Sequence, residues 1–310
     1  MADMHSCRTI DGKKIAASIR AGTIELLSAG GGSSKPVILT VSIGNDPSVE
    51  SYARQKEKEA AYTGIEFRRA HFGAEADEGE VTDLLRKGAN DANVNAIMIH
   101  APTPPGFDID RLSAAIPPEK DVDCLTSVSR GMLFSGKPMF APATAEAVIE
   151  ILKHEHIVTS KKHVVIIGRS LTVGKPLASL LLMRGQYADA TVTLCHSATD
   201  DIAKYTRQAD ILVAAAGRAH LVTGEMIRSG ATVIDVGINP LPVQGSERRQ
   251  DITGDVDFDS AFPIAGVMTP VPGGVGPVTS AVLMRNVARA WLKGISRRRP
   301  DRISSAEDRD

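Results

Sequence analysis

Tyr52 and Lys56 have the residue types and the spacing to support chemistry. They lie one helical turn apart in the string YARQKEKE, so their side chains share one face of a helix. A lysine in such a charged run is usually solvated, which is the simpler interpretation. The two residues follow a buried strand that ends at Gly44, and this position favours a functional role for Lys56. A lysine desolvated at such a strand end loses pKa and can act as an acid or base near neutral pH.

Asp123 and His100 are further candidates in the same part of the chain. His100 directly follows the apolar run 96–99, and Asp123 closes the string KDVD. A carboxylate there can accept hydrogen bonds from a polar heterocycle, although an ordinary turn carboxylate is the alternative. A histidine at a strand end is often a packed or capping residue. Because ligands bind beyond the carboxyl ends of parallel strands, we expect a site near Gly44, Phe72 and His100.

A glycine turn in residues 161–185, KKHVVIIGRSLTVGKPLASLLLMRG, is a candidate phosphate site. An apolar strand at 164–167 leads to Gly168, and Gly174 precedes a helical run that starts at Leu177 and ends at Gly185. Strand, glycine turn and helix together favour binding of a pyrophosphate. The spacing G-x-S-x-x-V-G-x-P differs from the usual G-x-G-x-x-G, so a structural turn that binds nothing is the alternative.

The end of the next strand indicates which dinucleotide would bind. Residues 195–199 read CHSAT, whereas an NAD site usually has an acidic residue there for the ribose hydroxyls. A 2′-phosphate instead needs hydroxyl donors and an arginine, which Ser197 and Arg169 supply. This pattern favours NADP. We find no serine nucleophile elbow and reject a Cys/His hydrolase. His154 and His156 diverge on a helix, so we expect no metal site.

Length and composition bound the remaining possibilities. A chain of 310 residues with 43% hydrophobic residues predicts two domains. With 36 basic and 37 acidic residues, the net charge of −1 gives no reason to expect nucleic acid or a membrane as a partner. Three widely spaced cysteines favour a reducing compartment, and no signal peptide or transmembrane segment is evident. We therefore expect a soluble cytoplasmic protein.

Strands alternate with helices along most of the chain, which predicts an α/β fold with parallel sheets. The predicted strands span 37–43, 65–72, 96–99, 164–167, 191–195, 211–215 and 232–236. Helices are predicted from the cap Asp11 to Ala29 and at 49–63, 78–90, 109–116, 144–154, 202–208, 224–229 and 278–291. A boundary near 145 separates two domains, 1–144 and 145–277, and the helix 278–296 is expected to complete the first. The charged tail 297–310 is predicted to be disordered.

Taken together, these strings closely resemble the bifunctional methylenetetrahydrofolate dehydrogenase/cyclohydrolase family, the FolD enzymes. The matching strings, in the family's order, are Y-x-x-x-K, KDVD, VVIIGRSLTVGKP, TVTLCHSAT, ADILVAAAG, VIDVGIN, GDVDF and TPVPGGVGPVT. The resemblance implies two α/β domains around a cleft, the second a Rossmann-type dinucleotide-binding domain, and a homodimer formed through the nucleotide domains. It also implies NADP-dependent oxidation of methylenetetrahydrofolate to methenyltetrahydrofolate, followed by hydrolysis to 10-formyltetrahydrofolate.

The resemblance also implies roles for individual residues. Tyr52 would stack on the aminobenzoyl ring of the folate, Lys56 would be the acid/base, and Asp123 would hold the pterin. Pro272, Gly273 and Gly274 would line the substrate site. The residues that would bind the cofactor are Gly168, Arg169, Ser170, Val173, Gly174, Ser197 and Ile238.

Several residues on the folate side depart from the family pattern. His100 stands where the family has a glutamine that hydrogen-bonds the catalytic lysine, Cys124 replaces a glycine, PATA at 142–145 replaces P-C-T-P, and Val49 replaces a small polar residue. A titratable His100 could repel protonated Lys56 and lower its pKa further. We therefore expect His100 to act at the catalytic site, with dehydrogenase activity retained and cyclohydrolase activity weakened.

Two other functions compete with the bifunctional enzyme. A dehydrogenase specialised for one-carbon catabolism would accumulate methenyltetrahydrofolate. A folate-binding paralogue without catalysis would bind folate and reduce no NADP, but the presence of Tyr52, Lys56 and Asp123 argues against it.

Overall fold

The chain folds into two compact units in the computed structural model, which describes residues 7–30, 34–242 and 250–298. A six-stranded unit comprises the chain up to Ala16 and residues 142–279. A three-stranded unit comprises residues 17–141 and the chain from Ser280. The predicted first domain therefore differs at its beginning, because the segment before Ala16 belongs to the six-stranded unit.

The three-stranded unit is built on a small parallel sheet. Its strands are β2 (Val37–Ile43), β3 (Glu66–Phe72) and β4 (Ala96–Ile99), in the order β3-β2-β4. Its helices are α2 (Pro47–Thr63), α3 (Glu78–Asn90), α4 (Ile109–Ser113) and α5 (Ser127–Phe134), with most of α1 (Gly12–Ala29) and α10 (Val275–Arg298). One face of the sheet forms an apolar core with α3 and α4, which includes Leu39, Val41, Leu85, Ile97 and Leu112. Since β2 lies between β3 and β4, the chain changes direction across β2, and ligands bind at such a switch point.

Helix α2 has clear signals at both ends. The side chain of Asp46 accepts a hydrogen bond from the backbone N–H of Ser48 at 2.8 Å, and Pro47 occupies the first helical position. At the other end Gly64 adopts the left-handed conformation, with φ of 78°. The helix therefore begins two residues before the predicted start.

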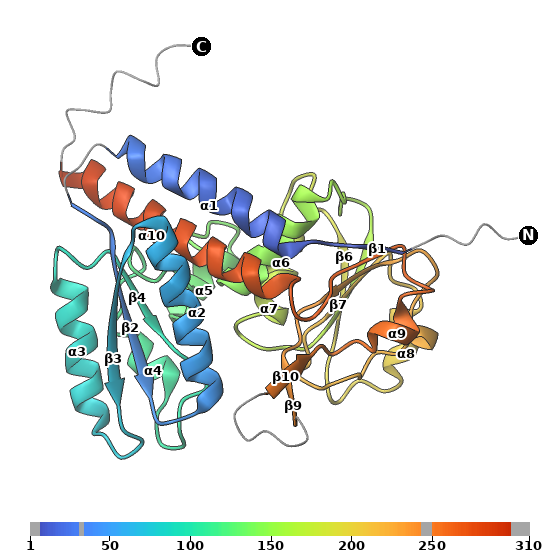
Figure 1. Cartoon of the computed structure of the whole chain (residues 1–310), viewed down its shortest axis with the longest axis horizontal. Coiled ribbons are helices and arrows are strands. Elements are labelled where there is room, and N and C mark those ends of the chain that lie inside the picture. The colour runs from blue at the N-terminus through green and yellow to red at the C-terminus, as the bar shows by residue number, and fades with distance from the viewer. Residues whose placement is uncertain (1–6, 31–33, 243–249, 299–310) are drawn as a thin grey trace, which may run out of the picture. The chain divides into compact units, whose positions relative to one another are not determined.

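The six-stranded unit is built on a parallel sheet with the strand order β1-β11-β8-β7-β5-β6. Its strands are β1 (Arg8–Thr9), β5 (His163–Ile167), β6 (Thr191–Cys195), β7 (Ile211–Ala214), β8 (Thr232–Asp235) and β11 (Val267–Met268). Its helices are α6 (Ala143–His154), α7 (Gly174–Leu181), α8 (Ile202–Thr206), the 3₁₀ helix η1 (Gly224–Met226) and α9 (Phe258–Ala261). A hairpin of β9 (Asn239–Pro242) and β10 (Gln250–Thr253) follows β8. Figure 1 shows the two sheets and their helices.

Strand β5 lies between β6 and β7, and the chain leaves it first to β6 on one side and then to β7 on the other. This arrangement is the topological switch point of a doubly wound dinucleotide-binding fold. Apolar side chains of β5, β7 and β8 pack on one face against α8, η1 and α9, including Val165, Leu212, Tyr205 and Phe258. The predicted Rossmann-type α/β architecture is confirmed for this unit.

Several short elements were not predicted. These are α5, α9, the β9–β10 hairpin, the edge strand β1 and its neighbour β11; the two strands have two residues each. The last helix starts at Val275 and ends at Arg298, so the predicted disordered tail begins too early. The rest of that tail, 299–310, lies outside the described residues. No helix in the described part of the chain has the length and apolar character needed to cross a membrane.

Candidate active site

Lys56 and Tyr52 share one face of α2, as predicted from their spacing. The Nζ atom of Lys56 lies 5.7 Å from the centroid of the Tyr52 ring. Burial lowers the pKa of Lys56, and the negative charge of Asp123 partly opposes this shift. Burial also raises the pKa of Tyr52, so its hydroxyl stays protonated. At a given pH, a larger fraction of Lys56 is therefore in the neutral amine form than of a solvated lysine.

Asp123 is positioned by the two residues that begin the string KDVD. The Nζ atom of Lys120 donates hydrogen bonds to carbonyl oxygens at the end of α3, including that of Ala89 at 2.7 Å. Asp121 is fully buried and accepts from the backbone N–H groups of Leu125 and Thr126 at 2.8 and 2.9 Å. These contacts fix the turn that contains Asp123. The carboxylate of Asp123 is partly exposed, and its negative charge raises the pKa of Lys56 against the larger lowering by burial.

Cys124, the residue after Asp123, adopts a positive φ of 54°. This conformation is one that glycine adopts without strain. The cysteine side chain is buried, and burial raises the pKa of its thiol to about 12, so the thiol is neutral. The neutral thiol therefore adds no charge next to Asp123.

His100 lies at the end of β4 and is only 3% exposed. Its backbone N–H donates to the carbonyl of Val41 at 2.8 Å, which aligns it with the end of β2. Burial, followed by the positive charge of Lys56, lowers the pKa of His100 to about 3. Within the described residues, Nε2 of His100 has no hydrogen-bond partner.

The predicted repulsion of Lys56 by His100 is therefore wrong at neutral pH. A histidine with a pKa of about 3 is neutral there and carries no charge to repel the lysine. Burial is the main reason that the pKa of Lys56 is lowered. The positive charge of Lys56 disfavours protonation of His100, so the imidazole stays neutral beside the lysine.

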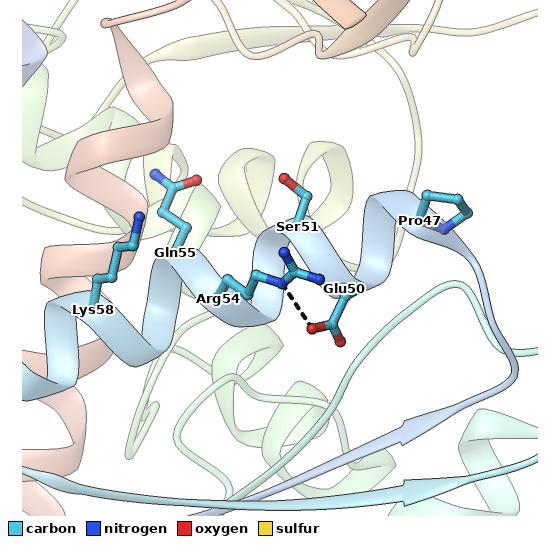
Figure 2. A pocket seen from close by; sticks show the side chains of 6 residues that line it. All are labelled: Pro47, Glu50, Ser51, Arg54, Gln55 and Lys58. Atoms are coloured by element: carbon cyan, nitrogen blue, oxygen red, sulfur yellow. Dashed lines mark hydrogen bonds and ion pairs between the residues drawn. The ribbon is translucent and has the colours of Figure 1, made fainter. Parts of the chain in front are cut away.

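A surface pocket on α2 does not include these residues. It is lined by Pro47, Glu50, Ser51, Arg54, Gln55 and Lys58, and its accessible volume is about 400 Å³. Figure 2 shows the side chains of Ser51, Gln55 and Lys58 along one side of the helix, with Arg54 paired to Glu50 at 2.9 Å. By helical spacing, Lys56 lies on the opposite side from this pocket. The pocket therefore lies away from the candidate residues Tyr52 and Lys56.

The glycine turn lies in the six-stranded unit, at the carboxyl end of β5. Gly168 has φ of 120°, and its N–H donates to the carbonyl of Cys195 at 2.8 Å. A Cβ atom added at Gly168 would overlap the carbonyl oxygen of Ala215, and one added at Gly174 would overlap that of Gly168. Helix α7 begins at Gly174, three residues earlier than predicted. The two glycines therefore let three backbone segments meet at the start of this helix.

Ser170 and Val173 shape this turn. The hydroxyl of Ser170 accepts a hydrogen bond from the backbone N–H of Val173 at 3.0 Å. The side chain of Ser170 is therefore engaged within the loop. The O–H of Ser170 is not the donor in this bond.

Arg169 and Ser197 follow neighbouring strands at the same level. Ile167 of β5 pairs with Cys195 of β6. Arg169 comes two residues after Ile167, and Ser197 comes two residues after Cys195. Both side chains are exposed. Adjacent strands lie about 4.8 Å apart, so the two side chains can contact one anionic group.

The loop with Pro272, Gly273 and Gly274 is supported by the beginning of the chain. Strand β1 pairs with β11, and Ile10 donates its N–H to the carbonyl of Met268 at 2.8 Å. A Cβ atom added at Gly12 would overlap the carbonyl oxygens of Gly273 and Gly274. Sequence reasoning missed Gly12, although its place directly after the cap Asp11 was a usable signal.

Ile238 is 40% exposed in the loop after β8. The neighbouring Gly237 and Asn239 are both buried. The loop thus presents one apolar side chain at the carboxyl edge of the sheet, where a dinucleotide binds in this fold.

Each of the two units matches a known protein family domain. Residues 10–123 match the family described as tetrahydrofolate dehydrogenase/cyclohydrolase, catalytic domain, and residues 142–294 match its NAD(P)-binding domain. The bifunctional protein FolD of Caldanaerobacter subterraneus is 42% identical over 91% of this chain and 96% of its own length. The FolD protein of Nocardia farcinica is 44% identical, with the same coverage of each chain.

Solved structures give the same result. The Trypanosoma brucei methylenetetrahydrofolate dehydrogenase-cyclohydrolase, complexed with NADP and an inhibitor, is 36% identical with a TM-score of 0.87 over 93% of this chain and 98% of that one. The Campylobacter jejuni FolD enzyme is 33% identical, with a TM-score of 0.85 over 94% of this chain and 100% of that one. The chain therefore belongs to the tetrahydrofolate dehydrogenase/cyclohydrolase family, the bifunctional FolD enzymes of folate one-carbon metabolism.

Proposed function

We propose that Lys56 is the proton-transfer group in this chain's oxidation of methylenetetrahydrofolate and hydrolysis of the methenyl product. The observation that carries this proposal is the lysine itself, which is desolvated on α2, close to the Tyr52 ring and within the electrostatic reach of Asp123. A lowered pKa makes the neutral amine available near neutral pH. Tyr52 offers a ring on which the aminobenzoyl group of the folate stacks, and Asp123 accepts hydrogen bonds from the pterin.

Hydrolysis depends on this amine. Water adds to the methenyl carbon and gives a proton to neutral Lys56. The ammonium returns a proton to the ring nitrogen as the carbon–nitrogen bond breaks, while the hydroxyl of the intermediate loses its own proton. One proton is released overall, and the product is 10-formyltetrahydrofolate. Proton transfer by a positioned side chain contributes typically 10²- to 10⁴-fold to such a rate.

The residues of the six-stranded unit fit NADP. The tight turn at Gly168 and Gly174 ends directly at the start of α7, which suits a pyrophosphate. Exposed Arg169 and Ser197 suit a 2′-phosphate. When bound, NADP supplies the hydride acceptor, and the protein contributes mainly orientation.

We expect NADP to bind at least tenfold more tightly than NAD. The Arg169→Leu variant should lose most of this preference. Equal affinity for both cofactors in the unaltered chain would contradict the assignment of NADP.

A second candidate function is a dehydrogenase with weakened cyclohydrolase activity. It is favoured by His100, whose Nε2 is buried without a partner among the described residues. A neutral imidazole offers one donor and one acceptor in a fixed ring, whereas a glutamine amide reaches further and accepts through a carbonyl oxygen. His100 is thus less suited to orient the Lys56 amine, and proton transfer to water-derived intermediates depends on that orientation more than hydride transfer does.

One assay separates the two candidates. Methylenetetrahydrofolate is mixed with NADP and each of two enzymes, the unaltered chain and its His100→Gln variant, and the methenyl product is followed as it forms and decays. With a weakened cyclohydrolase, the product accumulates in the unaltered chain and decays faster in the variant, while the dehydrogenase rates agree within a few fold. Equal hydrolysis in both would rule out a special role for His100.

We also propose a homodimer formed through the six-stranded unit, as the family resemblance implies. In support, β6 is an edge strand that pairs only with β5 in the described sheet, so its other edge is available for a second copy. Light scattering should give twice the mass of one chain. A single-chain mass at micromolar concentration would contradict this proposal.

A further inference from the structure

Two buried carboxylates in the six-stranded unit take no part in the chemistry described above. Asp235 ends β8 and is 4% exposed, and Asp255 follows β10 and is fully buried. Burying a carboxylate is costly unless hydrogen bonds satisfy its oxygens. Their partners therefore indicate what the two side chains do.

Asp255 holds the loop that follows β7. Its Oδ2 accepts from the backbone N–H groups of Ala216 and Gly217 at 2.6 and 3.0 Å, and its Oδ1 accepts from the N–H of Arg218 at 2.8 Å. The Nδ2 of Asn239 also donates to Oδ1, at 2.9 Å. One carboxylate thus links the loop after β7 to the loop after β8.

Asp235 holds the segment that contains Asp255. Its Oδ1 accepts from the backbone N–H groups of Gly237 and Asp255 at 2.9 and 3.0 Å, and its Oδ2 accepts from that of Val256 at 2.9 Å. The backbone N–H of Asp235 in turn donates to the hydroxyl of Thr269 at 2.7 Å. The same residue therefore connects the end of β8 to the segment 254–256 and to the start of the Pro272–Gly274 loop.

Two glycines leave room for the carboxylates. A Cβ atom added at Gly237 would lie 2.2 Å from Oδ1 of Asp255, and one added at Gly254 would lie 1.8 Å from Oδ2 of Asp235. Both distances are far shorter than any carbon–oxygen contact between nonbonded atoms. The backbone is thus closed around both side chains.

The loops that these carboxylates hold are the ones that border the proposed cofactor site. The carbonyl of Ala215 abuts Gly168 of the glycine turn, so Asp255 fixes the segment on which that turn rests. Ile238 stands between Gly237, which donates to Asp235, and Asn239, which donates to Asp255. The exposed apolar side chain is therefore anchored on both sides.

We propose that Asp235 and Asp255 are positioning residues that set the glycine turn and Ile238 for the dinucleotide. This inference rests on the proposed cofactor site. Each hydrogen bond described for the two carboxylates is donated by an N–H group, so the oxygens of both buried side chains have partners. Preorganised loops bind a ligand more tightly because less ordering remains for the binding step.

Three variants test this role. Asp255→Asn keeps the shape of the side chain but places an NH₂ group opposite N–H donors. Asn239→Ala removes the Nδ2 group that donates to Asp255 at 2.9 Å and to the carbonyl of Thr253 at 3.5 Å, and it leaves the other contacts of Asp255 in place. Asp259→Asn makes the same chemical change at an exposed residue of α9 and serves as the matched control. If Asp255→Asn does not fold, the measurements on Asn239→Ala test the positioning role.

Two measurements are made on each variant. Amide hydrogen exchange without ligand should be at least tenfold faster in residues 215–218 and 237–239 of Asp255→Asn than in Asp259→Asn. The Kd and KM for NADP should rise at least tenfold in Asp255→Asn and about threefold in Asn239→Ala, with kcat and the KM for the folate within twofold of the unaltered values.

The outcomes distinguish this inference from the proposed cofactor site. Unchanged exchange in these loops, or faster exchange with an NADP Kd within twofold, overturns the positioning role. Failure of the unaltered chain to bind NADP refutes the proposed cofactor site instead, because the exchange comparison needs no ligand and judges the loops independently.

Discussion

Replacing Gly168 by alanine tests whether the glycine turn depends on close approach of the backbone. The new Cβ would lie 2.0 Å from the carbonyl oxygen of Ala215. Restoring a normal separation of about 3.4 Å requires about 1.4 Å of movement between the turn and the loop after β7. A misplacement of about 1 Å in a ligand-orienting loop can cost about 100-fold, so we expect NADP to bind about 100-fold more weakly.

Gly185→Ala is the matched control for this variant. Gly185 also has a positive φ, 141° against 120° for Gly168, but no atom lies within 4 Å of an added Cβ. Both variants should lose about 1–3 kcal/mol of unfolding free energy through backbone strain. Only Gly168→Ala should lose NADP affinity, measured by titration calorimetry of folded protein. Equal NADP affinity in the two variants would refute the steric argument.

Three further predictions concern stability. Gly12→Ala should lower the unfolding free energy by about 1–3 kcal/mol because its Cβ overlaps backbone oxygens, whereas Gly22→Ala, with open space in the same helix, should raise it by about 0.5–1 kcal/mol; urea unfolding that gives the same sign for both would contradict this. The lowered pKa of His100 means that it stabilises the fold above pH 6.5 and that this stability is lost as pH falls toward 3. From pH 7 to pH 5 the unaltered chain should therefore lose about 2 kcal/mol more than His100→Gln, and parallel pH curves would exclude this. Burial raises the pKa of Asp235 to about 6, so its contribution is fully present below pH 3.8 and is lost as pH rises through 6. Asp235→Asn should lack a fall of about 1 kcal/mol between pH 5 and pH 7, and an undiminished fall in that variant would show that another group titrates.

Buried strands and capped helices could be predicted from the sequence because their signals are local. The strands 37–43 and 191–195 have the predicted bounds, since their apolar runs lie between clear turn residues. The helix ending at Thr63 was predicted to the residue because Gly64 follows it. The strands β1 and β11 have two residues each and no sequence pattern of their own, so they depend on tertiary pairing.

In the candidate site, too, the features with local sequence signals could be predicted, and those that depend on tertiary contacts could not. Tyr52 and Lys56 could be paired from helical spacing alone. The state of His100 could not, because its pKa depends on burial by residues far away in the sequence. Asp235 and Asp255 were noticed only as parts of motif strings, since their hydrogen-bond partners come from separate loops of the fold.

The central claim is that the Lys56 amine transfers the proton in hydrolysis, and the rate of methenyltetrahydrofolate hydrolysis by Lys56→Gln tests it most directly. After subtraction of the uncatalysed rate, we expect a loss of at least 100-fold relative to the unaltered chain, with the Kd for NADP unchanged. Hydrolysis by Lys56→Gln within a factor of three of the unaltered rate would contradict the claim.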